Sequence, residues 1–269
     1  MNSQLASSND MFQIRLARVD DAPSVYNLIA QGFGDRYLTY TIYQAPESVA
    51  YLRQLIANPS SAMQRTLYVL EQVGRLVGYY EAMQRGIEFW LNYVVVDTAV
   101  RRRGIGQALL EHFEHTAQQF HCQRLVLDVF DSNQPARDWY YLQGYQHQSA
   151  TFQIRLSTSM LDDASVHPLT YSDESWHNAC DEERSRGFSK VESGCGPGRI
   201  TVGLIGGRVC KLLEYVGVDL EDAVAAVCRH FHNTRSELIL TALEAIPIHW
   251  PVLSAEKTLR LVKPLTSVG

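Results

Sequence analysis

The chain has 269 residues, a net charge of −5 at pH 7, 46% hydrophobic residues and 20% charged residues. This length allows one large domain or two small ones, and the composition is that of a folded globular protein. The negative charge argues against nucleic acid or an anionic membrane as a partner. The five cysteines are odd in number and irregularly spaced, so we expect reduced thiols, a cytoplasmic location and no metal site.

The first half of the chain shows the hydrophobic periodicity of a mixed sheet. Residues 1–11 are polar and predict a flexible tail. Residues 12–157 then follow the order βααβββαβαββ, which predicts an α/β domain of the α+β mixed-sheet type. The expected strands are 12–18, 66–72, 76–83, 88–96, 124–130, 145–147 and 150–156. The expected helices begin at Asp20 or Asp21, at Glu47, at Ile105 and near Asn133, with an aromatic connector at 34–43.

The second half, residues 158–269, repeats this pattern in a blurred form. We expect a helix at 173–186, a hairpin of strands 199–206 and 209–216, a helix at 219–232 capped by Asp219, and strands at 236–245 and 257–264. The two halves also end in similar apolar strands, 152–156 and 259–265. These similarities predict a diverged internal duplication.

A basic glycine turn lies between strand 88–96 and the next helix. Its sequence is Arg101-Arg102-Arg103-Gly104-Ile105-Gly106-Gln107. The first N–H groups of a helix have no partner within the helix, and the helix dipole adds positive charge there. Glycines let the backbone approach a phosphate closely, and arginines add paired donors. The turn therefore predicts a pyrophosphate site. At the corresponding helix start, the second half has carboxylates at 219, 221 and 222, which would repel a phosphate.

A second motif follows one strand later, and it reads Asn133-Gln134-Pro135-Ala136-Arg137-Asp138-Trp139-Tyr140-Tyr141-Leu142-Gln143-Gly144-Tyr145. Together with the R-x-x-G-x-G pattern of Arg101, Gly104 and Gly106, it makes residues 12–156 similar to the GNAT N-acetyltransferase superfamily. The resemblance implies a GNAT-like fold, followed by a second, degenerate GNAT-like domain in residues 158–269. It also implies acetyl-CoA or another acyl-CoA as the co-substrate, with no metal.

The resemblance further implies where the acyl-CoA lies. Backbone groups of Val94 and Val96 would pair with the pantetheine arm, and Asn133 would contact the same arm. Arg101 or Arg103 would pair with the pyrophosphate directly. The backbone amides that would cradle the pyrophosphate are those of Arg103, Gly104, Ile105, Gly106 and Gln107.

Acyl transfer requires a proton donor for the leaving thiolate, and the second motif assigns this role to Tyr140, with Tyr141 as a fallback. A backbone N–H near Val94 would polarise the thioester carbonyl. The base is left open between two glutamates and a water held by an amide. Many members of the family carry a glutamate where this chain has Asn92, and an amide can hold a water but cannot accept the amine proton. Glu88 lies on the same strand face by the two-residue period, and Glu81 lies on the preceding strand.

Tyr37, Tyr40 and Tyr43 recur every three residues in the connector. With Glu81 they would line the acceptor pocket, or they would only pack the connector onto the sheet. Two functions stay open. The first is an N-acyltransferase that transfers acetyl from acetyl-CoA to a primary amine of a small molecule or peptide by direct attack. The second is a non-catalytic CoA-binding or sensing module whose second half is an interaction surface. We expect no nucleic acid or membrane partner, and a monomer or homodimer.

Overall fold

A single mixed sheet runs through the molecule. The computed structural model describes residues 12–58, 65–160, 167–243 and 250–265. In these residues the strand order is β1-β2-β3-β4-β5-β12-β6-β11-β10-β9-β8-β7. The strands are β1 Phe12–Leu16, β2 Arg65–Gln72, β3 Arg75–Arg85, β4 Glu88–Val96, β5 Arg124–Phe130, β6 Gln146–Ser157, β7 Leu169–Thr170, β8 Phe188–Cys195, β9 Gly198–Ile205, β10 Val209–Val216, β11 Glu237–Ala242 and β12 Val252–Pro264. The expectation of a mixed α/β sheet is confirmed.

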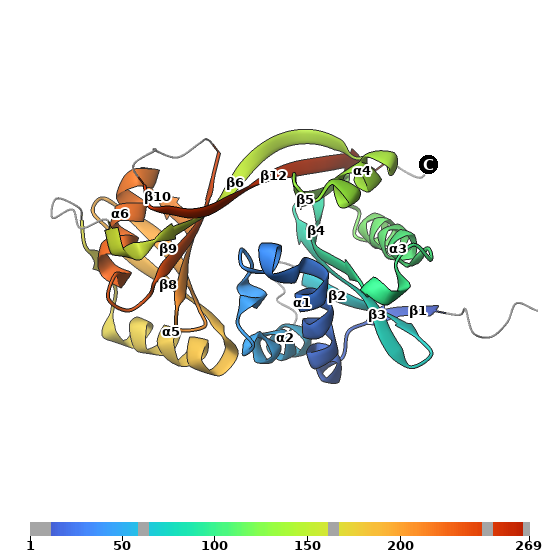
Figure 1. Ribbon diagram of the computed structural model, residues 1–269, viewed down its shortest axis with the longest axis horizontal. Helices are drawn as coiled ribbons and strands as arrows, with labels where there is room; N and C mark the ends of the chain where they lie inside the picture. The colour runs from blue at the N-terminus through green and yellow to red at the C-terminus, as the bar shows by residue number, and fades with distance from the viewer. Residues whose placement is uncertain (1–11, 59–64, 161–166, 244–249, 266–269) are drawn as a thin grey trace, which may run out of the picture.

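Helices cover both faces of the sheet. They are α1 Ala22–Leu38, α2 Ser48–Ala57, α3 Ile105–Gln119, α4 Gln134–Leu142, α5 Asp173–Arg186 and α6 Leu220–Phe231. In the first half, α1 and α2 lie on one face and α3 and α4 on the other (Figure 1). Strand alternation separates the two cores, because Tyr79 packs with α1 and α2 whereas Tyr80 packs with α3. We call the side with α1 and α2 the connector face. None of the described helices is long and apolar enough to cross a membrane.

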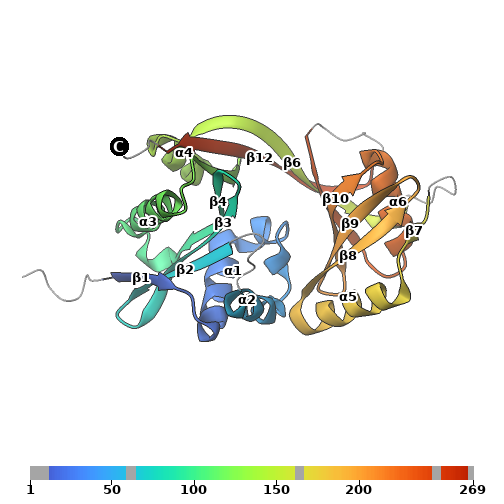
Figure 2. The ribbon, with the colours of Figure 1, turned by 180° about the vertical axis from the view of Figure 1, so that it is seen from behind.

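The last strand of each half is hydrogen-bonded into the sheet of the other half. β12 lies between β5 and β6 and pairs antiparallel with β5 from Thr258 to Pro264. β6 in turn pairs with β11 through residues 152–157. β6 and β12 also pair with each other and form the arch that joins the two lobes (Figures 1 and 2). The boundary predicted at residue 157 divides the sequence into two halves. The sheet does not divide there, because β6 pairs with β11 of the second half and β12 pairs with β5 of the first.

Two strands are longer than the sequence indicated. The segments expected as strands at 145–147 and 150–156 form the single strand β6, because β12 and β11 support it along its length. The strand expected at 257–264 begins at Val252, where it already pairs with β6. Both differences arise from the exchange of strands between the halves, which a local pattern does not reveal.

The connector begins as helix. α1 continues through a break at Gly34, where φ is 59°, and ends at Leu38. Asp21 directly precedes α1 as expected, but its carboxylate makes no capping bond to a helix N–H. It accepts hydrogen bonds from the backbone N–H of Arg18 and from the guanidinium of Arg15, each at 2.7 Å. Asp21 therefore stabilises the segment before α1 and does not cap the helix.

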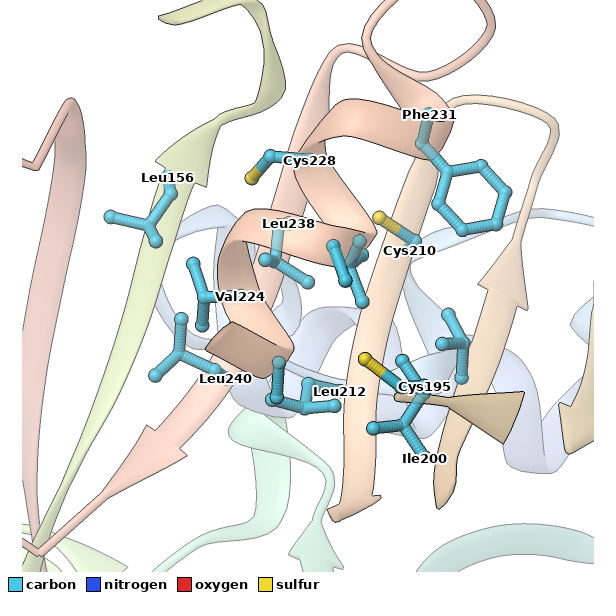
Figure 3. Packing of buried hydrophobic residues seen from close by; sticks show 14 of the residues in the cluster. Leu156, Cys195, Ile200, Cys210, Leu212, Val224, Cys228, Phe231, Leu238 and Leu240 are labelled. Carbon is cyan, nitrogen blue, oxygen red and sulfur yellow. The ribbon is translucent and has the colours of Figure 1, made fainter. Parts of the chain in front are cut away.

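The second half has its own apolar core between α6 and the sheet (Figure 3). Asp219 caps α6 as predicted, accepting a hydrogen bond from the N–H of Asp222 at 2.8 Å. The buried stripe of α6 includes Val224 and Phe231. The five cysteines are free thiols, as expected. Burial raises the pKa of the Cys228 thiol to about 12, so this thiol stays protonated near neutral pH.

The second half repeats one topological unit of the first. β10, α6 and β11 form a parallel crossover, as do β4, α3 and β5. In both units the parallel pairing is short and stops before β10 or β4 ends. β10 pairs with β11 only from Val209 to Lys211, and β4 pairs with β5 only from Glu88 to Leu91. This common arrangement is the one that a diverged duplication would leave.

The connector packs against the sheet of the second half. Tyr40 and Ala45 share a buried cluster with side chains of that sheet, namely Phe188, Ile205, Val209 and Ile239. The ammonium of Lys211 donates to the backbone carbonyl of Tyr40 at 3.0 Å, and burial lowers the pKa of Lys211 to about 8. α2 and α5 meet at Gly187, where a Cβ would lie 2.8 Å from the backbone N of Ser48. The second half thus fixes the connector in place.

The strand exchange predicts that a second-half residue stabilises the first-half core. Leu261 of β12 is fully buried in the cluster that packs against α3. We expect Leu261→Ala to lower the free energy of unfolding by about 2–5 kcal/mol, because it leaves a cavity there. Leu253→Ala is the control on the same strand, where the side chain is 54% exposed, and we expect a change within about 0.5 kcal/mol. Urea unfolding measures both values, and equal effects would contradict this placement of β12.

Candidate active site

β4 and β5 separate in the middle of the sheet. They pair in parallel as far as Leu91 and Leu127. β4 then continues to Val96 and β5 to Phe130 without further pairing between them. We call the separated segments, residues 92–96 and 128–130, the strand opening. No described strand pairs with this edge of β4, so its backbone groups are available to an extended ligand, apart from the Val96 carbonyl, which accepts a hydrogen bond from Arg101. Val94 and Val96, predicted to bind the cofactor, lie on it.

A β-bulge at Asn92 starts the separation. Leu91 pairs with Ala82 of β3 and Tyr93 pairs with Glu81, so Asn92 has no opposite residue. A bulge places one extra residue in a strand, bends it and increases its twist. Both Asn92 and Tyr93 therefore face the connector side, where Asn92 contacts Glu81 and Tyr93 packs with α1 and α2. The bend directs the rest of β4 away from β5.

The basic glycine turn connects β4 to α3. Gly104 precedes the helix with φ of 81°, a left-handed conformation that favours glycine. The first intrahelical bond runs from the N–H of Ala108 to the carbonyl of Gly104, so the N–H groups of residues 105–107 have no acceptor within the helix. Arg101, Arg102 and Arg103 are all exposed. Positive charge and free backbone donors therefore meet at the start of α3.

Side chains around the turn refine the prediction. The Nε of Arg101 donates to the carbonyl of Val96 at 3.2 Å, which holds this arginine against the end of β4. The amide of Gln107 donates to Glu111, so Gln107 offers the site only its backbone. A Cβ on Gly106 would lie 3.8 Å from the nearest atoms of Trp139, an ordinary contact. Packing within the chain therefore does not explain why residue 106 is glycine.

α4 carries the second motif. Asn133 precedes this helix, and its side chain makes no capping hydrogen bond, so its amide is available to a ligand. Tyr140 is 5% exposed, and its ring packs against that of Tyr145 with the centroids 5.7 Å apart. Burial raises the pKa of the Tyr140 phenol, which keeps the proton that a general acid needs. Tyr141, the fallback, is 40% exposed and lies outside this core.

Glu81 is the centre of a buried polar network on the connector face. Its side chain is fully buried. One carboxylate oxygen accepts hydrogen bonds from the hydroxyl of Tyr43 at 2.9 Å and from that of Tyr79 at 3.0 Å. The other accepts one from Nδ2 of Asn92 at 2.6 Å and lies 3.3 Å from Nη1 of Arg65. Because these partners enclose it, Glu81 has no room to take a proton from an amine substrate.

The charges within this network support one another. Burial alone would lower the pKa of Arg65, but attraction to the Glu81 carboxylate raises it overall. Burial raises the pKa of Tyr43 and of Tyr79, and the charge of Glu81 raises both further. The phenols therefore remain donors. Asn92 is exposed, and because its NH₂ group faces the carboxylate, its Oδ1 is left as a free acceptor at the bulge.

Glu88 lies on the same face of β4 as Asn92, as the two-residue period predicted. The separation of four positions corresponds to about 13 Å along the strand. The Glu88 carboxylate forms an ion pair with Arg124 and accepts a hydrogen bond from the indole N–H of Trp90 at 2.9 Å. It therefore braces the first residues of β4 and β5 and does not adjoin the strand opening.

Asp128 is a carboxylate that the sequence analysis missed. Leu91 and Leu127 form the last parallel pair, so Asn92 and Asp128 are the first residues on the two sides of the strand opening. Leu127 belongs to the core beneath α3, and strand alternation turns Asp128 to the opposite, connector face. Asn92 faces the same way. No local motif marked Asp128, because its place follows from where β4 and β5 part.

Arg260 of β12 holds the Asp128 carboxylate. Its Nε and Nη2 donate to the two carboxylate oxygens at 2.9 Å and 3.0 Å. The same guanidinium lies 4.6 Å from the ring centroid of Trp90 on β4. It therefore reaches from β12 across β5 toward β4. The hydrogen bond to Asp128 is the main reason that the pKa of Arg260 is raised.

The three connector tyrosines are divided between two places. Tyr37 stacks on Phe130 of β5 with ring centroids 4.5 Å apart, and Tyr40 lies 5.9 Å from the same ring. The Tyr40 hydroxyl donates to Ser254 of β12 at 2.8 Å. Tyr43 instead belongs to the Glu81 network. β12 therefore contributes second-half side chains beside the strand opening, a role that no sequence signal indicated.

Comparison with known proteins agrees with this geometry. The model of the acetyltransferase (GNAT) family matches residues 24–145. The peptidyl-lysine N-acetyltransferase YiaC of Escherichia coli K12 is 36% identical over 86 residues, which are 32% of this chain and 53% of YiaC. The chain thus spans about half the length of that relative.

Solved structures match over nearly the whole chain. A tandem GNAT protein from the clavulanic acid biosynthesis pathway has a TM-score of 0.69 and 14% identity, over 94% of this chain and 98% of its own. A putative acetyltransferase from Pyrococcus horikoshii has a TM-score of 0.62 and 14% identity, over 99% and 93%. Residues 24–145 therefore form a domain of the GNAT family, and nearly the whole chain shares the fold of a tandem GNAT protein, with a second GNAT-like region.

The buried network predicts an order of stability effects. We expect Glu81→Ala to lower the free energy of unfolding by about 3–5 kcal/mol, because it leaves the Arg65 charge buried without a partner. Tyr79→Phe removes one donor to the carboxylate and should cost about 1–2 kcal/mol. Chemical denaturation followed by fluorescence ranks the two variants. An equal or larger cost for Tyr79→Phe would contradict the central place of Glu81.

Proposed function

We propose that the protein is an N-acetyltransferase that transfers the acetyl group of acetyl-CoA to a primary amine of a small molecule or peptide by direct attack. The observation that carries this proposal is the position of the strand opening. The core that contains Tyr140 also includes Val129 of the opening and Ile105 at the start of α3. A phosphate site, an extended binding edge and a proton donor are therefore available to one ligand.

The chain offers acetyl-CoA three kinds of contact. The backbone N–H groups of residues 103–107, with Arg101 and Arg103, suit the pyrophosphate. Val94 and Val96 present a strand edge with which an extended pantetheine can pair as an added strand. The uncommitted amide of Asn133 suits the same arm. The thioester would then lie at the strand opening.

The amine would approach from the connector face. α3 and α4 cover the other face of the first-half sheet, so a thioester between β4 and β5 is accessible from the side of α1 and α2. Asn92 is exposed on this side. Tyr37 and Tyr40 flank the same end of β5. They are the connector tyrosines that we propose to contact the acceptor.

In the proposed reaction the amine nitrogen attacks the thioester carbonyl, a C–N bond forms and the C–S bond breaks. A backbone N–H near Val94 stabilises the negative charge on the carbonyl oxygen. Tyr140 donates its proton to the leaving sulfur and regains one from solvent. Oδ1 of Asn92 accepts a hydrogen bond from the amine or from a water beside it. Asn92 does not itself remove the proton.

One observation favours a second candidate, a CoA-binding or sensing module without turnover. The position that carries a glutamate in many GNAT enzymes is Asn92, and the neighbouring Glu81 is enclosed. The two candidates differ in one measurement. The enzyme releases thiol from acetyl-CoA when an amine is added, whereas the module binds CoA and releases none with any amine.

The role of Tyr140 predicts a loss of rate without a loss of binding. We expect Tyr140→Phe to lower kcat by about 10²–10⁴-fold, the usual contribution of a general acid, with an unchanged Kd for CoA. Tyr145→Phe is the control, because its hydroxyl is buried beside Tyr140 with no hydrogen-bond partner in the described residues. Thiol release measures both rates. Similar kcat values for the two variants would exclude Tyr140 as the acid.

The basic turn predicts a specific weakening of CoA binding. A hydrogen bond to a charged group contributes about 1.5–3 kcal/mol, so we expect Arg103→Ala to raise the Kd for CoA about tenfold or more. Arg184→Ala on the exposed face of α5 removes the same charge away from the turn and should leave Kd unchanged. Titration calorimetry measures both. If the two variants bind alike, the pyrophosphate lies elsewhere.

A further inference from the structure

The strand opening has one exposed side chain on each of its two strands that faces the connector. Asn92 follows the last residue of β4 that pairs with β5, and Asp128 follows the last residue of β5 that pairs with β4. Paired neighbouring strands lie about 4.8 Å apart. The first residues beyond the last pair are therefore still close, and the amide of Asn92 and the carboxylate of Asp128 lie on the two sides of the strand opening.

The two side chains offer an amine complementary acceptors. Asn92 is held by Glu81, which leaves its Oδ1 free. A carboxylate has about four lone-pair positions, and the two hydrogen bonds from Arg260 use one on each oxygen of Asp128. The Asp128 side chain is 38% exposed, so the remaining lone pairs are open to a ligand. Asp128 is the carboxylate nearest to the opening in the described sequence of β4 and β5, since Glu88 is at their far end.

We propose that Asp128 receives the acceptor amine and accepts its proton, with Arg260 as the residue that positions the carboxylate. This inference rests on the proposed acetyl transfer. Many GNAT enzymes carry a glutamate on β4 where this chain has Asn92. In this proposal Asp128, on β5, takes the role of that carboxylate. It also selects acceptors that arrive with a positive charge, namely primary aliphatic amines, because such an amine can bind a carboxylate as its ammonium form.

The proton balance is complete. The bound ammonium first gives one proton to solvent, and the neutral nitrogen then attacks the thioester carbon. As the C–N bond forms, the nitrogen becomes positively charged, and its second proton passes to the carboxylate of Asp128. The C–S bond breaks, and Tyr140 supplies the proton to the sulfur. Asp128 releases its proton to water, and Tyr140 takes one up, so the products are the amide and the free thiol.

Arg260 has a positioning role. It donates to both oxygens of Asp128, and its guanidinium also lies against the Trp90 ring. The carboxylate is thus held between β12 and β4 instead of rotating freely. Because Arg260 belongs to β12, the second half of the chain would determine how the acceptor is held in the first half.

The test uses the full chain and thiol release from acetyl-CoA with n-butylamine, spermidine and a lysine-containing peptide as probes. We expect Asp128→Asn to lower kcat/KM for the best amine about 100-fold, with the KM for acetyl-CoA within twofold. The deficit should shrink as the pH rises from 7 to 10, because hydroxide then removes the proton. Arg260→Met should give a smaller loss, and Arg260→Lys should restore part of it.

Glu237→Gln is the matched control, since Glu237 also binds an arginine, Arg155, across neighbouring strands but lies in the second half away from the opening. Its kcat/KM should equal that of the unaltered chain. Unchanged kinetics for a folded Asp128→Asn variant, or an equal loss for Glu237→Gln or Glu88→Gln, would overturn the role of Asp128. If the unaltered chain binds CoA but releases no thiol with any probe, the proposed function and this inference both fail.

Discussion

The loss of hydrogen bonding between β4 and β5 after Leu91 and Leu127 is the constraint on which the site depends. Adjacent strands normally satisfy each other's backbone groups, so a sheet that parts in its middle needs a local cause. The cause here is the bulge at Asn92, and the Glu81 network holds that bulge through a hydrogen bond on the connector face. A buried ion pair and two phenols therefore serve to hold one strand away from another.

The second half contributes to the site through β12 and through its contact with the connector. β12 completes the sheet next to β5 and brings Ser254 and Arg260 to the connector face. The sheet of the second half packs on the connector at Tyr40. The acidic start of α6 lacks the basic turn found at α3, so the two halves have diverged into different tasks. One carries the basic turn and the second motif, and the other contributes side chains beside the strand opening.

Local patterns predicted the first half well. The limits of β4 and β5 were predicted to the residue, and the basic turn and the motif around Tyr140 lie where their spacing placed them. These features depend on neighbours in sequence, such as the αL glycine that precedes a helix. The enclosure of Glu81 depends instead on Arg65 and Tyr43, which come from distant segments. A sequence pattern cannot show whether a carboxylate will meet such partners.

The strand that pairs with β12 and the position of Asp128 at the strand opening could likewise not be predicted from local sequence patterns. The strand at 257–264 was predicted, but nothing in it indicated that β5 would be its neighbour. Asp128 looked like the polar residue of an alternating strand. Its significance depends on the residue at which β4 leaves β5, which is set by a bulge register that alternation alone does not specify.

The exchange of β6 and β12 affects how the chain folds during synthesis. The ribosome delivers β5 long before it delivers β12, yet β12 is the strand that covers one edge of β5 and fills the core beneath α3 with Leu259 and Leu261. The N-terminal lobe therefore has an unpaired edge on β5 until residues 252–264 have emerged from the ribosome. Such edges readily pair with other chains. Assembly of the lobe that carries the basic turn therefore cannot be completed before both halves have been made.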